Sequence, residues 1–114
     1  MNYTQLDPSQ CEFYEVAGVN DVPNGERLFL EIGSEYIVLF NIAGVFYAIG
    51  DICSHDDGPL GDGEVDGHEV VCPRHGARFD LRNGKALTLP AVEDIPAFPV
   101  KVQDGKIEIG IPRK

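Results

Sequence analysis

Two short segments near the middle of the chain combine residue types that bind transition metals. The first, Cys-Ser-His, begins at Cys53, and the second, Cys-Pro-Arg-His, begins at Cys72 after sixteen intervening residues. Two thiolates and two imidazoles can bind zinc in a tetrahedral site, or a [2Fe–2S] cluster whose two irons have different ligands. The candidate metal ligands are therefore Cys53, His55, Cys72 and His75.

The order of these ligands favours the cluster over zinc. Zinc-finger sequences place both cysteines before both histidines, whereas each segment here carries one cysteine followed by one histidine. If the two segments lie on adjacent hairpins, Cys53 and Cys72 bind one iron, and His55 and His75 bind the other. Neutral imidazoles remove negative charge from the ligand set, so the reduction potential lies above that of an all-cysteine ferredoxin. A zinc-stabilised interaction module stays open as the less favoured alternative.

The elements that must position these ligands are short apolar runs separated by Gly-, Pro-, Asn- and Asp-containing turns. No run keeps a helical period beyond two turns, so the sequence predicts an all-β protein, a small antiparallel sandwich or barrel. Strands are expected over residues 11–16, 28–32, 36–42, 45–49, 79–81, 85–89, 98–102 and 106–109, with a further hairpin over 64–71.

Turn sequences specify how several of these strands are connected. Asp66-Gly67, Asn83-Gly84 and Asp104-Gly105 each fit the two-residue turn of a tight hairpin. The strands between residues 28 and 49 are expected to form an antiparallel meander with one buried face. By length, residues 1–114 are expected to form one domain, with the cluster-binding part at about residues 50–80.

The composition excludes some partners. A formal net charge of −10 argues against binding to nucleic acid or to anionic membrane surfaces, which both require clustered Lys and Arg. Acidic residues crowd the central stretch and can steer a basic protein partner toward it. They are Asp51, Asp56, Asp57, Asp62, Glu64, Asp66 and Glu69.

The expected location is the cytoplasm. Three cysteines do not make a disulfide framework, and the N-terminal sequence has neither the basic nor the apolar region of a signal peptide. No apolar run reaches the 18 or so residues that a membrane-spanning helix needs. Cys11 is expected to be a small buried apolar group, and His68 an exposed residue beside a turn.

The chain resembles the Rieske iron–sulphur proteins. Its two metal-binding segments match the two ligand boxes of that family, and the sequence Gly-Ala-Arg-Phe-Asp after His75 resembles the ferredoxin components of bacterial ring-hydroxylating oxygenases. The similarity extends over about residues 12–110. It implies the Rieske fold with a cluster-binding subdomain of two loops, and one Rieske-type [2Fe–2S] cluster. It also implies a flavin-dependent reductase and a terminal oxygenase as protein redox partners.

Departures from the family pattern predict a low reduction potential. High-potential members carry a disulfide between the boxes, where this chain has Gly58 and Arg74. They also carry a serine and a tyrosine that donate hydrogen bonds to sulphur, where this chain has Ala77 and Phe79. Because such hydrogen bonds raise the potential, the cluster is expected near the low end of the Rieske range of roughly −150 to +300 mV. Backbone amides of residues 56–60 and 76–78 are the expected donors to the sulphides.

The histidine count separates an electron carrier from an oxygenase. A mononuclear iron in a Rieske oxygenase needs two histidines and a carboxylate, yet the cluster leaves only His68 of the three histidines. The sequence therefore predicts a soluble one-electron carrier without catalytic residues, which passes electrons from a reductase to an acceptor such as a non-haem iron oxygenase. An accessory role in iron–sulphur assembly or redox sensing is the alternative.

Overall fold

The computed structural model describes residues 7–52, 58–74, 76–89 and 93–113. Within them, two short 3₁₀ helices, η1 (Pro8–Gln10) and η2 (Val19–Asp21), accompany ten strands. The strands are β1 (Cys11–Gly18), β2 (Arg27–Ile32), β3 (Glu35–Ile42), β4 (Val45–Gly50), β5 (Val65–Asp66), β6 (Glu69–Val71), β7 (Arg78–Asp80), β8 (Ala97–Phe98), β9 (Val100–Gln103) and β10 (Lys106–Pro112). The predicted all-β, antiparallel fold class is confirmed.

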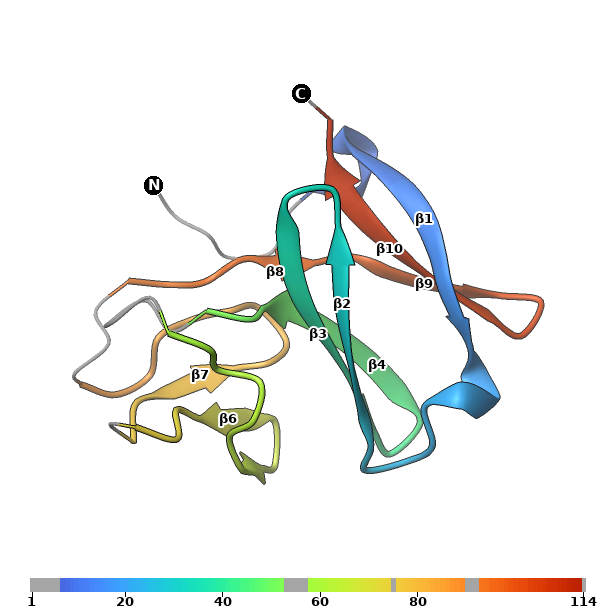
Figure 1. Ribbon diagram of the computed structural model, residues 1–114. Helices are drawn as coiled ribbons and strands as arrows, with labels where there is room; N and C mark the ends of the chain where they lie inside the picture. The colour runs from blue at the N-terminus through green and yellow to red at the C-terminus, as the bar shows by residue number, and fades with distance from the viewer. Residues whose placement is uncertain (1–6, 53–57, 75, 90–92, 114) are drawn as a thin grey trace.

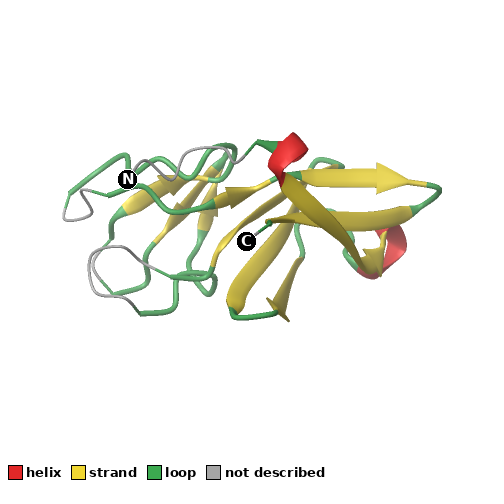
Figure 2. Ribbon diagram, turned by 90° about the horizontal axis from the view of Figure 1, so that it is seen from above, coloured by secondary structure: helices red, strands yellow, loops and turns green. Residues whose placement is uncertain are grey.

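Three antiparallel sheets organise this described part of the chain. The central sheet has the strand order β2-β3-β4-β8, the second β1-β10-β9 and the third β5-β6-β7. Figure 1 shows the third sheet on one side of the central sheet and the second sheet on the other. Seen from above in Figure 2, the strands fall into the same layers, with loops at the outer edge of the third sheet.

The central strand β3 is buried on both of its faces. Ile37 and Leu39 pack with the second sheet, whereas Val38 and Phe40 pack with the third. The expected antiparallel meander of β2, β3 and β4 is therefore confirmed, but the expectation of a single buried face is wrong for β3. An uninterrupted apolar run is typical of a strand covered on both sides, whereas a half-exposed strand alternates with polar residues.

Two of the three predicted tight hairpins form, one of them with a shift of register, whereas Asn83-Gly84 does not join two strands. Asp104-Gly105 joins β9 to β10 with positive φ at both residues, as a type I′ turn requires. The hairpin of β5 and β6 has the two-residue loop Gly67-His68 rather than Asp66-Gly67, because Asp66 pairs with Glu69. Gly67 then occupies the first central position with φ 63°, which glycine adopts without strain.

Residues 85–89 do not form the predicted strand, although an isolated bridge at Ala86 joins them to β7. Side-chain oxygens accept hydrogen bonds from two consecutive amides of this segment. Asn83 Oδ1 accepts from the amide of Lys85 at 3.0 Å, and Asp94 Oδ1 accepts from the amide of Ala86 at 2.9 Å. Local side-chain acceptors of this kind compete with sheet formation.

Pro99 divides the strand predicted over residues 98–102. Ala97–Phe98 pairs with β4 in the central sheet, and Val100–Gln103 pairs with β10 in the second sheet. Proline has no amide hydrogen to donate to a ladder, so the chain changes sheets there. The carbonyl of Pro99 still accepts from the amide of Gly110 at 2.9 Å.

Candidate metal centre

Cys72 lies at the base of a tight loop between β6 and β7. Its side chain is buried, with 1% of the residue exposed, and it forms no disulfide. Its amide donates to the carbonyl of Ala77 at 2.7 Å, and its own carbonyl accepts from the amide of Gly76 at 3.0 Å. Gly76 has φ 74°, a left-handed conformation that favours glycine. The loop therefore holds a thiol toward the protein interior.

The other three predicted ligands, Cys53, His55 and His75, lie outside the described residues. Within the ranges that the structure does describe, no group of three or more His, Cys, Asp or Glu side chains could hold a metal ion. Cys72 is thus the one predicted ligand whose position the structure gives. A buried thiol outside any disulfide fits the cysteine ligation that a [2Fe–2S] cluster requires.

Two charged side chains next to or within the central sheet form hydrogen bonds to residues 60–63, which follow the first ligand segment. Asp51 Oδ1 accepts from the amides of Leu60 and Gly61, at 3.0 and 2.6 Å. Arg27 donates through Nη1 to the carbonyls of Gly61 and Gly63, the second contact at 2.7 Å. Asp51 therefore joins the chain before residue 53 to the chain after residue 57, and Arg27 ties the latter to the central sheet.

Some predicted backbone donors to the sulphides already have protein acceptors. The amide of Leu60 donates to Asp51, and the amide of Gly76 donates to the carbonyl of Cys72. The amide of Arg78 donates to Thr88 Oγ1 at 3.0 Å. For these three amides the structure gives a protein acceptor. The expectation that residues 56–60 and 76–78 donate to the sulphides stays a prediction, and residues 56 and 57 lie outside the described residues.

Ala77 and Phe79 lie in the same apolar cluster as Cys72, and neither is exposed to solvent. Leu60, from the chain after the first ligand segment, and Val70, from β6, belong to the same apolar cluster. Since neither an alanine nor a phenylalanine side chain can donate a hydrogen bond, this wall of the candidate centre is apolar. The arrangement agrees with the predicted low potential, which stays a prediction.

The turn after β7 is fixed by an acidic residue. Asp80, with 7% of its surface exposed, accepts from Arg82 Nε at 3.0 Å and Nη2 at 2.9 Å, and from the Arg82 amide at 2.8 Å. The hydrogen bonds from the Arg82 side chain are the largest cause that lowers the pKa of Asp80, and burial opposes them.

Asp80→Asn is expected to destabilise the protein by about 1–2 kcal/mol at neutral pH. Because the pKa of Asp80 is lower in the folded chain than in the unfolded chain, its contribution is present above about pH 4 and is lost as the pH falls through the folded value. Urea unfolding of both proteins at pH 7 and near pH 3 measures this. A stability difference that does not shrink on acidification would contradict the assignment.

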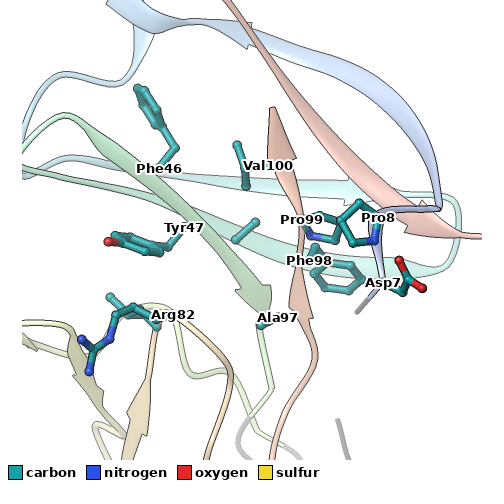
Figure 3. Close-up of a pocket in the computed structure, with 11 residues that line it drawn as sticks. Asp7, Pro8, Phe46, Tyr47, Arg82, Ala97, Phe98, Pro99 and Val100 are labelled. Carbon is teal, nitrogen blue, oxygen red and sulfur yellow. The ribbon is translucent and has the colours of Figure 1, made fainter. Parts of the chain in front are cut away.

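A hollow of about 530 Å³ lies between β4, β8 and the turn after β7. Figure 3 shows Tyr47 and Arg82 on one side of it and Phe98 with Asp7 on the other. Its described lining contains neither cysteine nor histidine. The hollow therefore adds no ligand to the candidate metal centre.

Cys11 and His68 take the places expected of them. Cys11 begins β1 with 3% of its surface exposed, and burial is the largest cause that raises the pKa of its thiol. His68 is exposed in the β5–β6 turn, where its ring meets the ring of Tyr47 edge-on at 5.8 Å between centroids. Neither residue belongs to the loop that contains Cys72.

Known proteins with similar sequences and structures define the class. Residues 12–99 match the Rieske [2Fe-2S] domain family. The chain is 46% identical over 95 residues to the 3-phenylpropionate/cinnamic acid dioxygenase ferredoxin subunit of Escherichia coli (strain K12), covering 82% of this chain and 89% of that one. The structure matches the ferredoxin of carbazole 1,9a-dioxygenase from Nocardioides aromaticivorans with a TM-score of 0.81 and 27% identity, over 89% of this chain and 98% of that one.

A second structural match comes from the complex of reduced oxygenase and oxidized ferredoxin in carbazole 1,9a-dioxygenase. Its matching chain has a TM-score of 0.81 and 25% identity, over 90% of this chain and 95% of that one. The chain therefore belongs to the Rieske [2Fe-2S] domain family. Its cofactor is one Rieske-type [2Fe–2S] cluster rather than zinc, and it is an electron-transfer component rather than a catalytic subunit.

None of the helices in the described part of the chain combines the length and the apolar character needed to cross a membrane.

Proposed function

We propose that this chain is the ferredoxin component of a ring-hydroxylating oxygenase system in the cytoplasm. It accepts single electrons from a flavin-dependent reductase and passes them to a terminal oxygenase. The observation that carries the proposal is the 46% identity to a dioxygenase ferredoxin subunit across most of both chains. The structural match to a ferredoxin in complex with its oxygenase supports the same partner class.

The proposed ligands are Cys53 and Cys72 on one iron, and His55 and His75 on the other. The burial of Cys72 supports an inner position for the cysteine-bound iron. Arg74 and Gly76, which flank His75 in the sequence, are both exposed, and this supports an outer position for the histidine-bound iron. When bound, the cluster supplies a one-electron redox couple with a potential that we expect at the low end of the Rieske range.

In this proposal the described residues around the two ligand segments bind no substrate. They orient and shield the ligand loops. Cys72 is held by the backbone bonds of its loop, and Asp51 and Arg27 hold the chain beyond the first segment. Exposed carboxylates such as Asp62 and Glu64 lie on that same returning chain. They favour association with a basic surface on the partner, at a rate that falls as salt is added.

Anaerobic mixing of the reduced protein with an oxidised terminal oxygenase tests the proposal. A carrier regains its oxidised visible spectrum within the mixing experiment and keeps its iron when the two proteins are separated again. Transfer of the iron to the acceptor would instead support an assembly role. Absence of reoxidation by any oxygenase encoded beside this chain would contradict the proposed partner.

A further inference from the structure

We propose that Arg74 is a positioning residue that fastens the second ligand loop to the first. The inference rests on the proposed ligand assignment, but not on the identity of the electron donor or acceptor. Arg74 lies in the second ligand segment, directly before His75, and its side chain reaches the chain that returns from the first segment. There Nη1 donates to the carbonyl of Pro59 at 2.6 Å, across fifteen residues of sequence.

Gly58 provides the space in which the guanidinium group lies. A Cβ atom built on Gly58 would be 2.8 Å from Cζ and from Nη2 of Arg74, and 3.0 Å from its Nε. Side-chain carbon atoms do not approach other heavy atoms this closely, so any larger residue at position 58 must displace Arg74. The backbone of Gly58 is outside the left-handed region, so glycine is needed there for space and not for its conformational freedom.

These two contacts define what we name the Arg74 bridge: the guanidinium group of Arg74, the backbone of Gly58 and the carbonyl of Pro59. The first loop is held from the central sheet by Asp51, and the second is held between β6 and β7. The bridge joins these two separately supported loops on their exposed side.

Its expected effect is kinetic retention of the cluster. Removal of a loop-to-loop contact makes local opening of the two loops easier, and ligands on separated loops release iron faster. The bond is a charge-assisted one from an exposed side chain, so we expect an effect of about tenfold on the release rate rather than complete loss of the cluster.

A double-mutant cycle on the holoprotein tests the bridge. Gly58→Ala, Arg74→Ala and the double variant are compared for the rate at which an iron chelator bleaches the visible absorbance. Each single change is expected to raise the rate about tenfold, and the double variant to release iron no faster than Arg74→Ala. Lys85→Ala, which removes an exposed cation from the same part of the chain, is expected to match the wild type.

Two further substitutions of Arg74 test the bridge without any change at Gly58. Arg74→Lys retains a donor for the Pro59 carbonyl and is expected to slow release relative to Arg74→Met, which retains only bulk. Equal release from the Lys and Met variants, or from Arg74→Ala and the wild type, would overturn the proposal. A release rate in the double variant that is raised by the product of the two single effects would also overturn the proposal. Since no redox partner is present, failure here leaves the proposed electron carrier untouched.

Discussion

Cys72→Ala is expected to abolish cluster binding, whereas Cys11→Ala is expected to leave it intact. Both thiols are buried and neither forms a disulfide, so burial alone does not separate them. Their positions do. Cys72 opens the loop between β6 and β7 that contains His75, whereas Cys11 begins β1 and directs Sγ to the carbonyl of Asp7 at 3.4 Å.

The measurement is iron content and visible absorption of the purified variants. Loss of one thiolate leaves an iron of the cluster three-coordinate at best, and the cluster is not retained. Because metal binding contributes to folding stability, the Cys72 variant is also expected to unfold at a lower temperature than the Cys11 variant. Full iron content in Cys72→Ala, or a colourless Cys11→Ala protein, would contradict the ligand assignment.

Gly63→Ala is expected to destabilise the fold by roughly 3–5 kcal/mol, a large effect for one methyl group. A Cβ atom at position 63 would lie 1.8 Å from the carbonyl oxygen of Val71, so the two backbones must separate. They cannot separate freely, because Gly63 donates to the carbonyl of Leu60 at 3.0 Å and accepts from Arg27 at 2.7 Å. The segment after the first ligand loop would therefore lose its place beside β6.

Gly33→Ala is the matched control for this substitution. Gly33 has φ 61°, but nothing lies within 4 Å of a Cβ built there, so alanine meets conformational strain without a clash. That strain costs about 1 kcal/mol. Urea unfolding of both variants measures the difference, and equal stabilities would show that relieving the contact with Val71 costs no more than the strain at Gly33.

The positions of most strands follow from the local sequence, but the sheet that each strand joins does not. Turn sequences such as Asp104-Gly105 specify a hairpin by their own backbone preferences. The sequence around Pro99 reads as one strand, because the exchange of partners there depends on where β4 and β10 lie. Burial of both faces of β3 corresponds to the apolar run over residues 37–40, which contains no alternating polar residue.

The candidate site, too, could be predicted from the sequence only in part. Residue type and spacing were sufficient to propose Cys72 and its partners, since few side chains bind iron and sulphur. The residues that hold the loops could not be proposed, because Arg27 and Gly63 are 36 positions apart and meet only in the folded chain. The acidic composition around Asp51 indicates a charged surface, whereas in the structure its carboxylate accepts hydrogen bonds from the amides of Leu60 and Gly61. Similarly, nothing local connects Gly58 with Arg74.

Pulsed electron paramagnetic resonance of the reduced protein tests the central claim most directly. That claim is one [2Fe–2S] cluster held by Cys53 and Cys72 on one iron and by His55 and His75 on the other. The predicted result is a signal from the reduced cluster with strong hyperfine couplings to two imidazole nitrogens, and loss of one coupling in His75→Cys. A reduced cluster signal without nitrogen coupling, or a sample that stays silent after confirmed reduction, would contradict the claim.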